Sequence, residues 1–306
     1  MVKYDIITFG SAVVDTFVHT DVAEKKDLIC YPTGGKILIN RLQFEIGGGG
    51  TNTAVAFSRF GLKTGCICNV GDDENGHKVL NLLKDEKIDF LGKVDKTGMS
   101  GYSVILDSRG GERTILTYKG VNDDICANEI DMNKISTKWI YYSALLSKSF
   151  ETQRKLARLL CNKGVKLAFN PSSYIINNED ISDLLRICEV LILNKEEAYS
   201  LYKRYNAKGG ILEGLHSLGP KIVVITNRDK DTWCYDGKKH YKSVPHKTIK
   251  VVERTGAGDA FASGFVAGLI IGKSIEESLK LGLKESESVI TSRGAKTRLL
   301  KMKLKR

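Results

Sequence analysis

Strand-like apolar runs alternate with helical stretches through most of this chain, and that rhythm limits the fold more than any other feature. The expected strands are 4–10, 65–70, 139–143, 166–170, 190–193 and 222–226. The expected helices are 52–60, 75–86, 150–161, 180–187, 195–202, 211–217, 257–271 and 275–291. Strands that alternate with helices build a mostly parallel sheet with helices on both faces, so the sequence predicts an α/β fold.

Two stretches do not follow this rhythm. Residues 17–45 alternate apolar and polar side chains and contain Pro32, which favours short strands. Strands at 102–107 and 113–118 are joined by a glycine-containing turn at 108–111, which predicts a hairpin. We expect these stretches to form a small separate sheet, a lid made by about 14–45 and 98–120, within one domain spanning 1–306.

Composition excludes several classes of protein. The 306 residues carry a net charge of +11, but apart from the tail 301–306 the basic residues are scattered. They do not interleave with aromatic residues as in single-strand binders, which argues against a nucleic-acid partner. The seven cysteines contain no CxxC pair, so zinc and redox sites are not expected. Without a membrane-spanning run or a signal-peptide pattern, we expect no membrane association and a cytoplasmic location.

The segment Thr255-Gly256-Ala257-Gly258-Asp259 stands directly before an apolar helical run. Glycines let the backbone approach a ligand closely, and a helix start points unpaired N–H groups and a partial positive charge at it. This pattern favours an anion site, most naturally for phosphate. Asp259 lies where it could take a proton from an attacking hydroxyl. The alternative is a glycine turn capped by an aspartate.

Three other polar segments follow strands. Gly47–Gly50 leads to Asn52 at a helix start, and Asp15 follows the first strand. Asn194 and Glu197, three apart on an opening helical turn, could share the water shell of Mg²⁺ and phosphate oxygens. Their alternative is a capping box, and Asp15 could be an exposed turn residue. Ligands bind outside the carboxyl ends of strands in such sheets, so these segments should converge.

In order and spacing, these segments resemble the ribokinase (PfkB) family of sugar and nucleoside kinases over nearly the whole chain. The matching residues are Gly10, Ser11 and Asp15; Gly47, Gly48, Gly50 and Asn52; Gly111–Thr114 and Gly120–Asn122; Asn194 and Glu197; and Val252–Asp259. The resemblance implies a Rossmann-like ribokinase fold with a β-sheet lid, and ATP-dependent phosphorylation of a hydroxyl on a sugar-like substrate.

The resemblance also implies roles for individual residues. Asp259 would be the catalytic base, and the amides of Gly256, Ala257 and Gly258 would form the anion hole for the transferring phosphoryl group. The expected substrate-binding residues are Asp15, Gly47, Gly48, Asn52 and Arg113, although Arg113 could equally be a solvated lid charge. The expected ATP-binding residues are Asn194, Glu197, Thr226, Arg228, Thr255 and Gly294, with Glu197 holding Mg²⁺ through water.

The chain departs from the family pattern at several positions. Glu253 stands where relatives usually have the aspartate of a monovalent-cation loop, which leaves K⁺ binding open. Arg228 replaces a common glycine and could alter the choice of nucleotide or point to solvent. Gly49 and Val13 replace polar residues of ribokinases proper, which favours a nucleoside as the alternative substrate. A third hypothesis is a nucleotide- or sugar-binding protein without catalysis. We expect the lid to pair two subunits.

Overall fold

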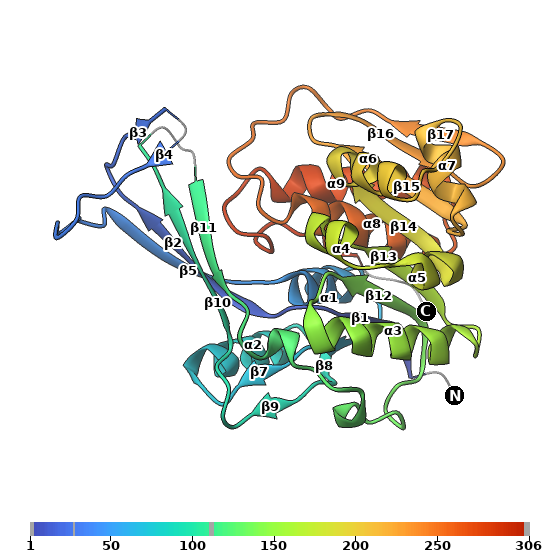
Figure 1. The fold of residues 1–306 in the computed structure, drawn as a ribbon, viewed down its shortest axis with the longest axis horizontal. Helices are drawn as coiled ribbons and strands as arrows, with labels where there is room; N and C mark the ends of the chain where they lie inside the picture. The colour runs from blue at the N-terminus through green and yellow to red at the C-terminus, as the bar shows by residue number, and fades with distance from the viewer. Residues whose placement is uncertain (1–2, 27, 110–112, 303–306) are drawn as a thin grey trace.

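The fold is built on a nine-stranded sheet, described here from a computed structural model of residues 3–26, 28–109 and 113–302 (Figure 1). Its strands are β1 (Tyr4–Phe9), β6 (Thr64–Ile67), β8 (Asp89–Phe90), β12 (Thr137–Ser143), β13 (Lys166–Asn170), β14 (Cys188–Asn194), β15 (Ile222–Asn227), β16 (Lys230–Tyr235) and β17 (His240–Ser243). They are ordered β17-β16-β15-β14-β13-β12-β1-β6-β8. Only β15, β16 and β17 pair antiparallel, so the sheet is mostly parallel, as expected.

Helices cover both faces of this sheet. They are α1 (Gly49–Arg59), α2 (Glu74–Asp85), α3 (Ser147–Cys161), α4 (Ser173–Asn178), α5 (Ser182–Ile187), α6 (Lys195–Arg204), α7 (Ile211–Ser217), α8 (Ala257–Ile270) and α9 (Ile275–Val289). Helices α3 to α7 share one buried apolar cluster with the sheet, and α1, α8 and α9 share another. No helix in the described residues is long and apolar enough to cross a membrane.

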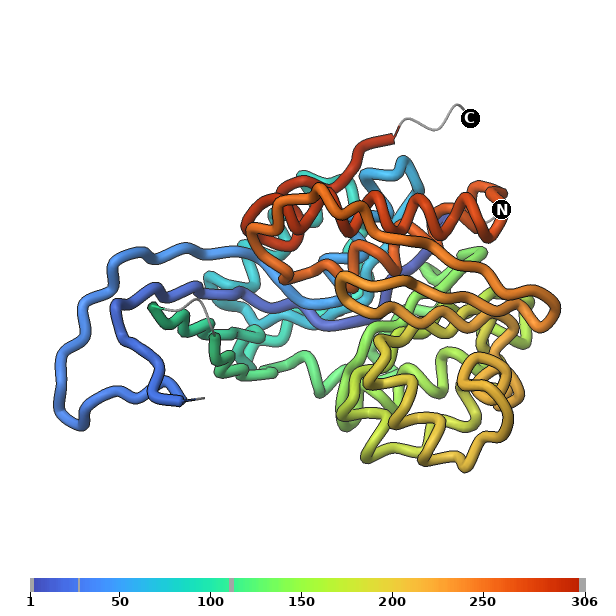
Figure 2. Tube along the Cα trace, turned by 90° about the horizontal axis from the view of Figure 1, so that it is seen from above, coloured from blue at the N-terminus to red at the C-terminus, as the bar shows by residue number. Residues whose placement is uncertain are grey.

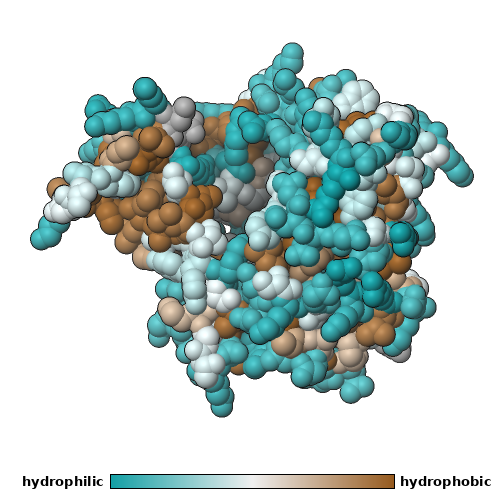
Figure 3. Space-filling view, viewed as in Figure 1, coloured by the Kyte–Doolittle hydropathy of each residue, from teal (hydrophilic) through white to brown (hydrophobic). Residues whose placement is uncertain are grey.

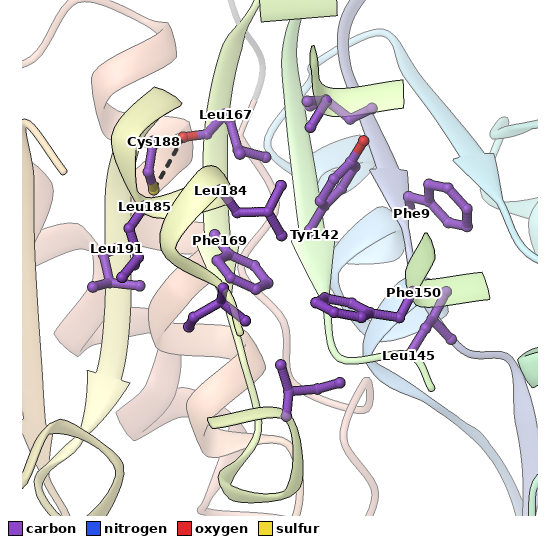
Figure 4. Close-up of a cluster of buried hydrophobic side chains, with 14 of the residues drawn as sticks. Phe9, Tyr142, Leu145, Phe150, Leu167, Phe169, Leu184, Leu185, Cys188 and Leu191 are labelled. Carbon is purple, nitrogen blue, oxygen red and sulfur yellow. Dashed lines mark hydrogen bonds between the residues drawn. The ribbon is translucent and has the colours of Figure 1, made fainter. Parts of the chain in front are cut away.

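Successive strand residues supply the two clusters alternately. Ile6 and Tyr141 pack on the α1, α8 and α9 side, whereas Ile7 and Tyr142 pack on the other side. Figure 4 shows the second cluster, in which Tyr142 and neighbouring strand residues meet side chains of α3 and α5. Because both faces are buried, these strands read as continuous apolar runs, which explains why the sequence identified them.

A second sheet projects from the core as the lid (Figures 1 and 2). Its strands are β2 (Val13–His19), β5 (Arg41–Gly47), β10 (Gly101–Asp107) and β11 (Arg113–Tyr118), ordered β11-β10-β2-β5. The expected hairpin is present as β10 and β11, and its turn residues 110 and 111 lie outside the described residues. Two short pairs, β3 (Glu24–Lys25) with β4 (Leu28–Ile29) and β7 (Val70–Gly71) with β9 (Val94–Asp95), complete the strands.

The sequence missed part of one sheet edge. Strands β16 and β17 were not predicted, because their charged residues conceal the alternation in which Thr232 and Cys234 are buried while Trp233 is 41% exposed. The short helix α4 was also missed. The predicted strand 65–70 is divided between β6 and β7, and its last residue pairs with β9 instead of the large sheet.

Glu285 of α9 gives a test of this packing. The side chain is fully buried, one carboxylate oxygen accepts the Leu300 N–H at 2.9 Å, and burial raises its pKa from 4.5 to about 7. The folded state therefore holds a proton that the unfolded chain releases, so this contribution to stability is complete below about pH 4.5 and is lost as the pH rises through about 7.

We predict that Glu285→Gln raises the free energy of unfolding at pH 8 by about 2–3 kcal/mol and leaves it nearly unchanged at pH 4.5. Denaturant titrations at the two pH values measure the difference. Glu276→Gln is the control, because Glu276 is exposed on the same helix and its pKa is lowered by its bond to Lys239. Equal stabilisation by Glu285→Gln at both pH values would contradict the prediction.

Candidate active site

Polar residues gather at the carboxyl edge of the large sheet. Ser143, Asn170, Asn194 and Thr226 are at or next to the carboxyl ends of β12, β13, β14 and β15, and the register pairs Ser143 with Asn170 and Asn194 with Thr226. The helices α1 and α8 begin at the same edge, where Asn52 of one contacts Asp259 of the other. The expected convergence of segments far apart in the sequence is therefore present in the structure.

Asp259 is the centre of this cluster. Its Oδ2 accepts a hydrogen bond from Asn52 Nδ2 at 2.8 Å, and its Oδ1 faces the backbone of Gly49, where an added Cβ would lie 3.7 Å away. Burial raises the pKa of the Asp259 carboxyl, while the Asn52 bond and the charge of Lys296 lower it. One carboxylate oxygen is thus occupied, and the other lies beside the glycine segment and has no hydrogen-bond partner among the described residues.

The start of α8 has the geometry of an anion site. Gly256 precedes the helix with φ of 79°, and an added Cβ there would overlap Ala295, so only glycine fits. The amides of Gly256, Gly258 and Asp259 have no acceptor in the described part of the chain, whereas that of Ala257 donates to the Arg254 carbonyl at 3.2 Å. Three free N–H groups therefore surround the helix start, and that of Ala257 is occupied.

Asp15 reaches the site from the lid strand β2. An added Cβ on Gly47 would overlap its Oδ2, so the absence of a side chain at 47 makes room for this carboxylate. Burial raises the pKa of Asp15, opposed by a hydrogen bond from Ser103 and by the charge of Lys296. Asp15 is partly buried and lies in strand β2, so the alternative of an exposed turn residue does not hold.

Asn194 and Glu197 form the capping box that the sequence offered as an alternative. The Asn194 side chain accepts from the Glu197 N–H at 2.8 Å, and the Asn194 N–H donates to Glu197 Oε2 at 2.9 Å. Burial raises the pKa of Glu197. The negative charges of Asp259 and Glu197 both raise the pKa of the buried Tyr141 phenol, after the larger effect of burial, so both carboxylates lie near this residue.

Arg113 connects the lid to the segment before α8. Its guanidinium donates to Glu253 Oε1 at 3.1 Å and to Thr255 Oγ1 at 2.8 Å. The other Glu253 oxygen accepts the Gly294 N–H at 3.1 Å, and Glu253 is buried. A cavity of about 160 Å³ lies beside this bridge and is lined by Phe17, His19, Gln43, Asp107, Arg113, Val252, Glu253 and Arg293. The acid that could have held a monovalent cation therefore has a guanidinium partner.

A larger cavity of about 410 Å³ is lined in part by Val251 and Arg254, which lie in the connection before α8. Apolar walls from Ile249, Val251 and Leu283 combine there with Arg228 and Arg254 at its rim. The Arg228 side chain is 76% exposed, with Glu196 4.0 Å away.

Glu287 lines the same cavity and accepts from the backbone N–H of His246 at 2.8 Å. Through this bond Glu287 ties His246, in the connection between β17 and α8, to helix α9.

Sequence reasoning missed two residues of the cluster. Lys296 donates to Asn52 Oδ1, and the Ser143 hydroxyl is buried beside Gly10 and Gly49 without a partner in the described residues. Ser143 could have been found, because it ends a predicted strand at the ligand edge of the sheet. Lys296 carried no signal, since a lone lysine in a chain with 47 lysines and arginines reads as surface.

With this geometry in place, comparison with known proteins is decisive. Residues 8–302 match the protein family described as "pfkB family carbohydrate kinase". The chain belongs to this family. It is 26% identical over 294 residues to a cytidine kinase of Thermococcus kodakarensis, covering 95% of this chain and 97% of that protein. It is 27% identical over 295 residues to a ribokinase of Bacillus subtilis, covering 95% and 94% respectively.

Solved structures agree on the fold of this pfkB kinase. A nucleoside kinase of Methanocaldococcus jannaschii matches with a TM-score of 0.83 at 19% identity, covering 98% of this chain and 96% of that one. A ribokinase of Thermotoga maritima also gives 0.83, at 20% identity, covering 97% and 96%. The expected ribokinase fold and the assignment as a sugar or nucleoside kinase are therefore confirmed.

Proposed function

We propose that this pfkB kinase transfers the terminal phosphoryl group of ATP to a hydroxyl of a sugar or sugar-like substrate. The observation that carries the proposal is the juxtaposition of Asp259 with the free amides at the start of α8. Asp259 takes the hydroxyl proton through Oδ1, and the amides of Gly256 and Gly258 receive the charge of the transferring phosphoryl group. Asn52 keeps Oδ2 occupied, which orients the carboxylate.

The nucleotide and its metal are assigned from the surrounding residues. The cavity of about 410 Å³ beside Arg254 suits a nucleobase, because Ile249, Val251 and Leu283 give it apolar walls, with the phosphates directed toward Thr255 and Gly256. The described residues contain no cluster of three or more metal-binding side chains, so the fit is to a Mg²⁺ held mainly by phosphates and water, with Glu197 acting through water. The bound ion would neutralise phosphate charge during transfer.

The substrate lies between Asp15 and Asp259 in this proposal. A nucleoside is the second candidate, because Phe17 and Ile105 pair in register two residues beyond Asp15 and are buried on the same face of the lid. Such an apolar surface suits a nucleobase, and a curated relative is named cytidine kinase. ADP release with Mg²⁺-ATP across pentoses, hexoses, sugar acids, phosphosugars and nucleosides separates the two. ATP binding without turnover on any of them would favour a protein that has lost catalysis.

Asp259→Asn tests the proposed base. We predict that it lowers kcat by about three orders of magnitude and leaves ATP affinity nearly unchanged, because the proton acceptor is lost while the amides stay. Steady-state kinetics and calorimetric titration with ATP measure the two effects. Asp131→Asn, on the surface, is the control. Near-normal turnover in Asp259→Asn would exclude the mechanism.

The Arg113 bridge leads to a prediction about monovalent cations. Glu253 already has a guanidinium partner, so its site does not fit K⁺, and we propose that Arg113 supplies the positive charge there. Turnover should be the same in potassium, sodium and tetramethylammonium chloride. Arg113→Ala should create a dependence on K⁺, whereas Arg41→Ala, an exposed lid arginine bonded to Gln43, should not. Strong stimulation of the unmodified enzyme by K⁺ would contradict this assignment.

The lid also suggests a subunit contact. Its outer face exposes Leu42, Phe44, Leu116 and Tyr118 by half or more, and Figure 3 shows hydrophobic side chains gathered over the lid. We propose that two lids pair through this face, since such a patch on a sheet is a liability when uncovered. Light scattering at micromolar concentration should give twice the 33.9 kDa of the chain.

Phe44→Glu should halve that mass by burying a charge in the contact. Leu159→Glu, at an equally exposed leucine on α3, should leave it unchanged. A monomeric unmodified protein would refute the contact.

A further inference from the structure

Lys296 is a buried cation behind the candidate base. It follows Ala295 in the segment after α9, and only 8% of the residue is exposed. Its ammonium donates to Oδ1 of Asn52 and to the carbonyl oxygen of Ile46, near the end of lid strand β5. A buried lysine needs such partners, because an unpaired ammonium in a protein interior is strongly unfavourable.

These bonds fix the orientation of the Asn52 amide. An ammonium can only donate, so it faces the amide oxygen, and the amide nitrogen then points to Oδ2 of Asp259 at 2.8 Å. The reversed amide would set its N–H₂ against the ammonium and its oxygen against the carboxylate, losing both bonds. Lys296, Asn52 and Asp259 thus form a directed chain in which each donor has an acceptor.

The surroundings of Lys296 are mostly acidic. Carboxylates from three elements act on it, and one guanidinium and one thiol lie within range of its charge. These groups are Asp15 of β2, Glu45 of β5, Asp259 of α8, Arg59 of α1 and Cys66 of β6. Burial lowers the pKa of Lys296 to about 8, and the three carboxylates limit that fall. The ammonium is therefore the counterion of two carboxyls whose own burial favours the neutral form.

We propose that Lys296 is a positioning residue for phosphoryl transfer: through Asn52 it orients the Asp259 carboxylate, and with its charge it keeps that carboxylate ionised. The inference rests on the proposed role of Asp259 as base. During transfer, the substrate oxygen bonds to phosphorus as the bond to ADP breaks, and the hydroxyl proton passes to Oδ1. Lys296 itself exchanges no proton in this step.

A purely structural role for Lys296 makes a different prediction. The bond to the Ile46 carbonyl also ties the end of β5 to the core, and losing it would lower stability without altering any carboxyl pKa. The titration of Asp259 distinguishes the two roles. Lys78 provides a matched control, because it lines the same cavity of about 360 Å³ as Lys296 but is exposed and has no bond to Asn52.

The test is a carboxyl titration by NMR on full-length protein carrying ¹³C-labelled aspartate. In Lys296→Met and Lys296→Gln the pKa of Asp259 should rise by about one unit or more, since an opposite charge nearby has been removed. Lys296→Arg, which retains the charge, and Lys78→Met should leave it near the unmodified value. Thermal melts identify variants that do not fold. If Lys296→Met does not fold, Lys296→Gln and Lys296→Arg decide the comparison. An unchanged Asp259 titration in a folded Met or Gln variant overturns the proposal.

Activity gives a second readout once a substrate is found. The acidic limb of the kcat/KM profile should move to higher pH in the Met and Gln variants. The alkaline limb near pH 8 should disappear in both and shift upward in Lys296→Arg. If the unmodified protein turns over no substrate, the proposed kinase function fails, while the NMR titration still decides the role of Lys296. Identical profiles in all variants would refute the positioning role.

Discussion

The hydrogen bond between Asn52 and Asp259 is the contact on which the site depends, because it joins residues 207 positions apart in the sequence. Each stands in the first turn of a helix that begins at the carboxyl edge of the sheet. The bond requires α1 to begin close to β1 and β12, and an added Cβ on Gly50 would overlap the backbone of Gly10. The glycines before Asn52 therefore allow the first turns of α1 and α8 to come into contact. The same lack of side chains leaves their backbone open to a ligand.

Charges in the site are balanced locally, although the chain as a whole is strongly basic. Lys296 lies among Asp15, Glu45 and Asp259, and Arg113 neutralises Glu253 from the lid. Lys296 interacts with Asp15 and Glu45 of the lid, and Arg113 of the lid pairs with Glu253 of the core. The position of the lid and the electrostatics at the start of α8 are therefore linked. Lys296 and Glu253 are the buried members of these interactions, and salt screens a buried charge less than one on the surface.

The sequence predicted the features that repeat or that lie in short motifs. The alternation of strands and helices located the parallel sheet, and the segment around Asp259 indicated the candidate site. The sequence did not predict features that depend on contacts between residues far apart in the chain. Strands β16 and β17 form an antiparallel edge, and their charged residues hide the alternation of buried and exposed side chains. Lys296 becomes part of the site only because folding places it beside Asn52. Likewise, the amide of Ala257 is occupied by the Arg254 carbonyl, a turn bond that residue types do not reveal.

The two faces of the lid strands have different surroundings, and this limits where residues can be inserted or deleted. Along β2, Asp15 and Phe17 lie on one face, while Val14 and Thr16 lie on the opposite face, the one that also carries Phe44. One residue inserted in this strand would exchange the faces, moving the carboxylate to the opposite face and a valine to the face that Asp15 now occupies. Insertions and deletions should therefore be confined to the connection between His19 and Arg41, where the backbone is not committed to either face. Homologous lids would then differ in reach while keeping the same strand register.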